Sequence, residues 1–218
     1  QDKVEFPPGF SVVDDRQLEY SWRRRIETVP TLIKFDDNGE ELARVIGWEK
    51  SEWQALTGRP LGFYLPDFRP GCGSKSQDPG MPEKLAARFD RDKLQSRELT
   101  ISTEEDDMEA CFERGWSDGL PVVPPTAERV MRMLAGTNRS PDEVVGIVPP
   151  DLVLCTIEKI AINAVLAGCK PEYLPVVIAS VEAALQDEFC MHGLLATTYY
   201  SGPLVIVNGP MSRAIGMN

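Results

Sequence analysis

The sequence has little of what several large classes of protein require. It contains no uninterrupted apolar run near the roughly 20 residues of a membrane-spanning helix, and its charged start does not resemble a signal peptide. Basic residues are outnumbered by acidic ones, 23 to 34, so the formal net charge is −11. Such a surface repels nucleic acid and anionic membranes. We therefore expect neither as a partner, and we expect a small-molecule substrate instead.

Cysteine pairs and histidines are also scarce. None of the five cysteines forms a CxxC pair, and an odd number cannot all be paired within one chain. Small secreted disulfide proteins have a different pattern, so we expect reduced thiols and a cytoplasmic location. His192 is the single histidine, and with Cys190 it supplies only two of the three or four ligands of a zinc site. The sequence predicts no metal site and identifies no cofactor.

The first 58 residues predict a short α/β unit. Asn38-Gly39 is typical of a hairpin turn between two strands rich in β-branched residues. Leu18, Trp22 and Ile26 are spaced four apart, as on one face of a helix. The predicted elements are, in order, a strand over 10–13, a helix over 16–26, a strand over 28–35, the hairpin turn, a strand over 41–47 and a helix over 51–56.

Val29-Pro30-Thr31, then a strand, a hairpin and Arg44-Val45-Ile46-Gly47, resembles the second half of thioredoxin. The resemblance implies a cis Val29–Pro30 bond and a Pro30 that lies against thiols, which makes Pro30 a candidate substrate contact. An ordinary trans proline at a strand start is the alternative. The redox-active CxxC turn of that family is absent, because only nine residues precede the first predicted strand. We predict a partial thioredoxin-like domain over residues 1–58.

The remainder of the chain predicts a linker followed by a helix-rich α/β domain. Prolines and glycines are frequent between residues 59 and 100, with a charged helix predicted over 83–94. The second domain is predicted over residues 101–218 and is expected to be truncated at its C-terminus. Its predicted elements are helices over 103–115, 126–134, 155–167 and 171–185, and a buried strand over 203–210.

Gly71-Cys72-Gly73 is the sharpest local signal for chemistry. The flanking glycines leave the sulfur accessible, and Lys75 and Arg69 would favour its thiolate. Cys72 is therefore a candidate catalytic thiol. A flexible linker that happens to contain a cysteine is the alternative.

A second cluster surrounds the single histidine. His192 is a candidate general base, and Cys190, Thr197, Thr198 and Ser201 are its candidate nucleophiles. Thr197 and Thr198 are also candidate contacts to substrate. A structural histidine in a loop is the alternative. Asn208 lies at the end of the predicted strand 203–210, where either a ligand-facing loop or an ordinary turn is typical.

A third set lies on one predicted helix. Glu158 and Lys159 are candidate catalytic residues, and Asn163 is a candidate substrate contact. Polar side chains on an otherwise apolar helix line a pocket in some proteins and face solvent in others, and both interpretations stay open.

Residues 111–218 resemble a poorly characterised bacterial domain associated with UGSC-type thiol or selenol proteins. The likeness lies in four stretches: residues 114–126, 158–164, His192-Gly193 and 207–210. If Cys72-Gly73-Ser74-Lys75 is compared with the UGSC motif, Cys72 takes the selenocysteine position and Lys75 replaces the second thiol.

These observations lead to three functional hypotheses. The first is a thiol-linked oxidoreductase whose second domain binds a small molecule, with Cys72 or Cys190 as the thiol. The second is a hydrolase or lyase built from His192, Glu158, Lys159 and Asn208. The third is a non-catalytic subunit whose thioredoxin-like part docks onto a partner polypeptide.

Overall fold

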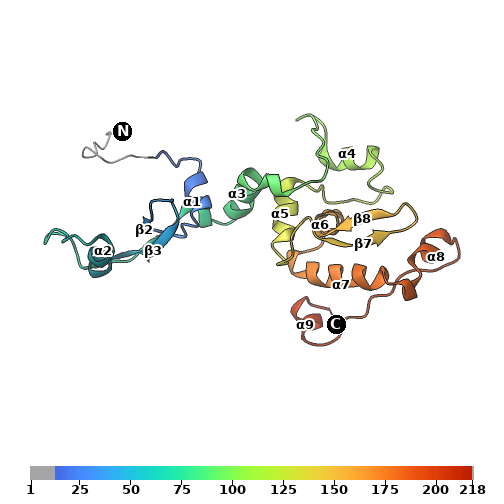
Figure 1. Cartoon of the computed structure of the whole chain (residues 1–218). Coiled ribbons are helices and arrows are strands. Elements are labelled where there is room, and N and C mark those ends of the chain that lie inside the picture. The colour runs from blue at the N-terminus through green and yellow to red at the C-terminus, as the bar shows by residue number, and fades with distance from the viewer. Residues whose placement is uncertain (1–12, 218) are drawn as a thin grey trace. The chain divides into compact units, whose positions relative to one another are not determined.

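The computed structural model describes residues 13–217, and the chain divides into two compact units, Gln1–Leu85 and Ala86–Asn218 (Figure 1). The chain contains both helices and short strands, and the strands form two-stranded antiparallel sheets among the described residues. The predicted mixed α/β class is thereby confirmed. The boundary between the units lies within helix α3 (Met81–Phe89).

A β-hairpin forms the centre of unit 1. Strands β2 (Thr31–Phe35) and β3 (Glu41–Ile46) pair around a turn in which Gly39 has φ +84°, as the Asn-Gly signal predicts. Helix α2 (Lys50–Thr57) follows and ends at Gly58, whose left-handed conformation stops it. The Val29–Pro30 bond is cis, which confirms that expectation.

The start of unit 1 differs from its prediction. Helix α1 spans Glu19–Arg23, which is shorter than the predicted 16–26, because Leu18 adopts a left-handed conformation (φ 61°) that a helix interior does not allow. The carboxylate of Asp15 accepts hydrogen bonds from the backbone N–H groups of Tyr20 and Ser21 instead. The predicted strand 10–13 lies outside the described residues except for Val13, which is not in a strand.

Part of the predicted linker belongs to the sheets of unit 1. Strand β6 (Cys72–Gly73) pairs with β1 (Thr28–Val29), and β5 (Phe68–Arg69) pairs with β4 (Trp48–Glu49). The short 3₁₀ helix η1 (Lys75–Gln77) then precedes α3, which overlaps the predicted helix 83–94 and is followed by η2 (Arg91–Lys93). Proline and glycine content alone could not reveal these pairings, because they join segments some 20 to 45 positions apart.

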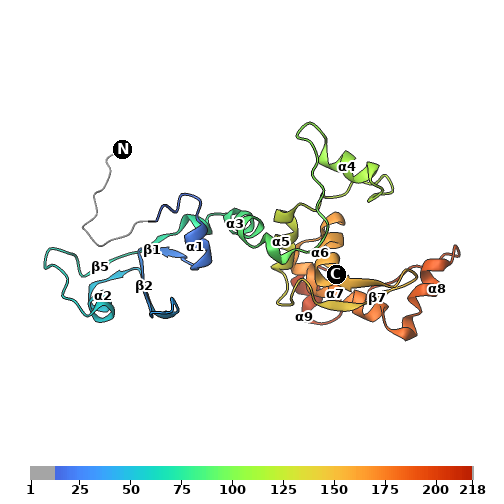
Figure 2. The ribbon, with the colours of Figure 1, turned by 45° about the horizontal axis from the view of Figure 1, so that its top comes forward.

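Unit 2 is built on three helices and one hairpin. Helices α5 (Ala127–Leu134), α6 (Ile157–Leu166) and α7 (Leu174–Ala184) pack with the hairpin β7 (Val144–Val148) and β8 (Val153–Thr156), as Figures 1 and 2 show. The spacing of the apolar residues of α6 predicts that five of them share one face, and all five are buried: Ile157, Ile160, Ala161, Ala164 and Val165. They form the core of this unit with side chains from α5 and α7.

The helix ends in unit 2 follow local capping rules. The Thr126 side chain caps α5 by accepting the backbone N–H of Arg129, and Gly168 ends α6 with φ +73°. Helix α4 spans Asp107–Glu113 and does not start at Thr103, because the Asp106 carboxylate accepts the backbone N–H groups of Met108 and Glu109. Asp106 lies three positions after Thr103 and takes the capping role in its place. The 3₁₀ helix η3 (Pro171–Tyr173) leads into α7.

The C-terminal strand prediction is wrong. Residues 203–208 form no regular element and have no strand partner within the described chain, and Leu204 and Ile206 are 83% and 73% exposed. An apolar run predicts a buried strand only where a neighbouring strand is available, and β7 and β8 pair with each other alone. Along the chain, η4 (Asp187–Phe189) and α8 (Met191–Ala196) precede this segment, and α9 (Pro210–Ala214) follows it.

Candidate functional site

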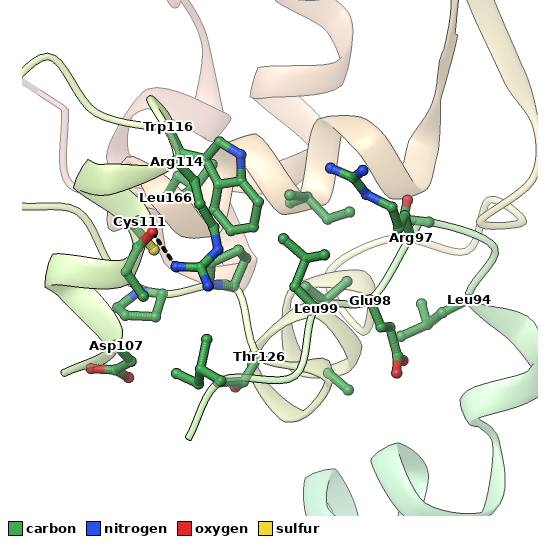
Figure 3. Close-up of a pocket in the computed structure, with 18 of the residues that line it drawn as sticks. Leu94, Arg97, Glu98, Leu99, Asp107, Cys111, Arg114, Trp116, Thr126 and Leu166 are labelled. Atoms are coloured by element: carbon green, nitrogen blue, oxygen red, sulfur yellow. Dashed lines mark hydrogen bonds between the residues drawn. The ribbon is translucent and has the colours of Figure 1, made fainter. Parts of the chain in front are cut away.

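The candidate site is a pocket of about 590 Å³ in unit 2. Its walls come from α4, α5, α6, the segment 94–101 and the prolines before α5 (Figure 3). Twelve of the 21 lining residues are apolar: Leu94, Leu99, Ile101, Ala110, Cys111, Trp116, Pro124, Pro125, Ala127, Val130, Ile162 and Leu166. The other nine lining residues are polar, and six of these are charged. A concavity of this size that combines apolar walls with polar groups is typical of a small-molecule site.

Glu158 fixes one wall of the pocket. It is 3% exposed in the first turn of α6, and its two carboxylate oxygens accept the backbone N–H groups of Gln95 and Ser96, each at 2.9 Å. A buried carboxylate is stable only when hydrogen-bonded in this way. The contact spans more than 60 positions of sequence and ties the segment 94–101 to α6. Glu158 therefore positions the wall.

The arginines around the pocket differ in their partners. Arg91 is paired with Glu98, and Arg114 donates to Glu105 at 2.9 Å. Arg97 forms no hydrogen bond or ion pair with any residue in the range 13–217. In Figure 3 the Arg97 guanidinium extends from the segment 94–101 toward the side of the pocket that Trp116 occupies. The pocket thus contains one arginine whose charge is uncompensated by a neighbour.

Cys111, the thiol in the pocket wall, is shielded from solvent. Cys111 is buried, and desolvation by burial raises its pKa, with a smaller contribution from the negative charge of Asp107. The group is therefore a neutral thiol near pH 7 and a poor nucleophile. It contributes an apolar surface next to Trp116, whose backbone N–H donates to the Cys111 carbonyl at 2.9 Å.

Two of the sequence-predicted residues line this pocket: Glu158 and Asn163. The Asn163 side-chain amide donates to the Lys159 carbonyl at 2.8 Å, one turn back along α6. Lys159 is exposed and does not line the pocket. Sequence reasoning missed Arg97, Cys111 and Trp116 as pocket residues. Trp116 lay within the stretch that carries the family resemblance, which was a usable signal, whereas Arg97 had none.

The predicted residues of the C-terminal segment do not join the pocket. Cys190, His192, Thr197, Thr198 and Asn208 are all exposed, and none of them is among its lining residues. Over residues 13–217, no three histidine, cysteine or acidic side chains cluster closely enough to hold a metal ion.

Cys72 lies in unit 1 and is exposed on β6, opposite Val29, the residue that precedes Pro30. The segment after it is fixed by hydrogen bonds: the Ser74 N–H donates to the Glu27 carbonyl at 2.8 Å, and the buried Ser76 hydroxyl donates to the Ile26 carbonyl at 3.1 Å. Cys72 is therefore held in an ordered strand pair, and the alternative of a flexible linker does not describe its surroundings.

Comparison with protein-family models, curated proteins and solved structures finds no match to this chain. None of the helices within residues 13–217 has the length and apolar character needed to cross a membrane.

Proposed function

We propose that the chain binds a small organic molecule in the unit 2 pocket, and that this binding serves a thiol-linked enzyme of the oxidoreductase class. The proposal rests on the pocket, which has a largely apolar lining, a volume of about 590 Å³ and a wall held in place by Glu158. Pockets that bind small ligands have volumes of roughly 300–1,000 Å³ and similar linings.

A pocket-filling substitution tests the binding half of the proposal. Leu99 lines the pocket and is partly exposed, so Leu99→Trp adds bulk there without disturbing the buried core. We expect fragments that bind the intact chain in a ligand-observed NMR screen to lose at least about tenfold in affinity, because each fragment must displace the new indole.

The matched control is Leu195→Trp, the same change at an exposed position of α8 outside the pocket lining. It should leave every fragment affinity unchanged. Fragments that bind equally well to both variants would show that binding takes place elsewhere, and the pocket assignment would then be wrong.

The thiol of the proposed enzyme is assigned to Cys72. Its exposure, its flanking glycines and its place in an ordered strand pair support this choice. We also infer that unit 1 is part of a thioredoxin-like fold, which the order of hairpin, strand and helix after Pro30 supports.

Thiol labelling distinguishes the exposed cysteines from the buried ones. With iodoacetamide at pH 7.5, Cys72 and Cys190 should be modified at least about tenfold faster than Cys111 and Cys155. Burial raises the pKa of both buried thiols, so their reactive thiolate is rare as well as shielded. Peptide mass mapping measures the rates, and chain unfolded in urea should show five equally reactive cysteines.

The same pKa shifts set a direction for stability. Above the ordinary thiol pKa of about 8.5 the unfolded chain loses protons that the folded, buried thiols keep, so the stability of unit 2 should fall as the pH rises through that range.

If Cys72 is labelled no faster than Cys111 at pH 7.5, the thiol half of the proposal fails, while the binding half is unaffected.

A further inference from the structure

The charges of the pocket favour an anionic ligand. Arg91 and Arg114 are paired with Glu98 and Glu105. The lining Asp107 lies 3.8 Å from the guanidinium of Arg129. Arg97 is exposed to solvent and is left as the lining arginine without a partner among the described residues. Glu158 is committed to two backbone N–H groups. A guanidinium beside an apolar cavity is stabilised by a carboxylate, which it can bind through two parallel hydrogen bonds.

The walls favour an apolar body behind that charge. Trp116 is exposed and Leu99 and Leu166 line the cavity with it, so a flat apolar group can pack against the indole. A single free guanidinium suits one negative charge, whereas a phosphate offers three oxygens that call for several donors.

We propose that this pocket binds a small organic carboxylate with an aromatic or apolar body, with Arg97 contacting the carboxylate and Trp116 packing against the body. The inference rests on the proposed function, since it names the chemical class of the molecule held in the same pocket. The chain has a net charge of −11, so attraction of the anion depends on the local charge of Arg97 and is weakened by added salt.

The test uses three probes of one shape on the whole chain: 3-phenylpropionate, 3-phenylpropionamide and 3-phenylpropylamine. Titration calorimetry should give the carboxylate an affinity at least about tenfold above that of the neutral amide, with the amine weakest. Arg97→Gln should remove the preference for the carboxylate while leaving amide binding unchanged. Arg97→Lys should retain part of it, because the charge remains and the paired donors do not.

Arg132→Gln is the matched control. Arg132 is exposed on α5 outside the pocket lining, so the variant makes the same change in net charge and should keep the full preference. Trp116→Ala should weaken all three probes alike by about fivefold, because it removes packing and no charge.

The outcomes separate this inference from the proposed function. Equal binding of the three probes, or tightest binding of the amine, overturns the anion assignment; loss of that binding in Leu99→Trp would still support the pocket. Failure of every probe to bind also overturns the carboxylate class, while the fragment screen decides independently whether the pocket binds small molecules. A carboxylate preference that survives Arg97→Gln removes Arg97 from the site.

Discussion

Ile157→Ala is expected to destabilise unit 2 by about 3 kcal/mol, within the range of large-to-small substitutions in a packed core. Ile157 is completely buried at the first position of α6, in the cluster that also contains Leu174 and Ile178. Alanine has the higher helix propensity, so any loss of stability comes from the removed methyl groups and the cavity they leave.

Hydrogen exchange of the α6 amides measures this loss within unit 2 without a contribution from unit 1. The matched control is Ile147→Ala on β7, where the isoleucine is 53% exposed and the same change should cost less than about 1 kcal/mol. Similar losses at the two positions would show that the cluster around Ile157 is not the core of unit 2.

The elements that the sequence predicts well are those with local signals. Helix α6 shows its apolar face at one-turn spacing and ends at a glycine, and the structure buries that face. The hairpin at Gly39 is equally local, because the turn chemistry of Asn-Gly needs no distant partner. Within these limits the fold class and the main helices of unit 2 could be predicted from the sequence.

The elements that it predicts poorly depend on distant partners. Residues 203–208 have the composition of a strand but no neighbour to pair with, and Cys72 looked like part of a linker although β6 pairs with β1, more than 40 positions away. Nothing in the sequence marked Arg97, because it was singled out by its position in the pocket wall and by the absence of an ion-pair partner within residues 13–217, and both depend on the folded structure. The pocket therefore could not be predicted as a site, although Glu158 and Asn163 were singled out.

Glu158→Ala is expected to destabilise unit 2 about as much as Ile157→Ala, because it removes hydrogen bonds, whereas Ile157→Ala removes core packing. The substitution leaves the backbone N–H groups of Gln95 and Ser96 without an acceptor, and hydrogen bonds to a charged group contribute about 1.5–3 kcal/mol each. We expect unit 2 to lose about 3 kcal/mol of stability, because part of the loss is offset when water reaches the freed amides.

The same variant should loosen the pocket wall. Exchange of the Gln95 and Ser96 amides should accelerate far more than exchange in α6, because those two protons lose their acceptor directly. Glu158→Gln should lie between wild type and Glu158→Ala, since the amide keeps one acceptor oxygen but turns an NH₂ group toward the second backbone N–H.

Glu188→Ala controls for the loss of one negative charge at an exposed position outside the pocket lining, and it should change neither stability nor exchange. If Glu158→Ala retained protection at residues 95 and 96, the carboxylate would not be what holds the wall. If instead the wall loosens and probe affinity falls with it, the buried carboxylate is what keeps the segment bearing Arg97 beside the pocket. Glu158 would then act in binding through the position of Arg97.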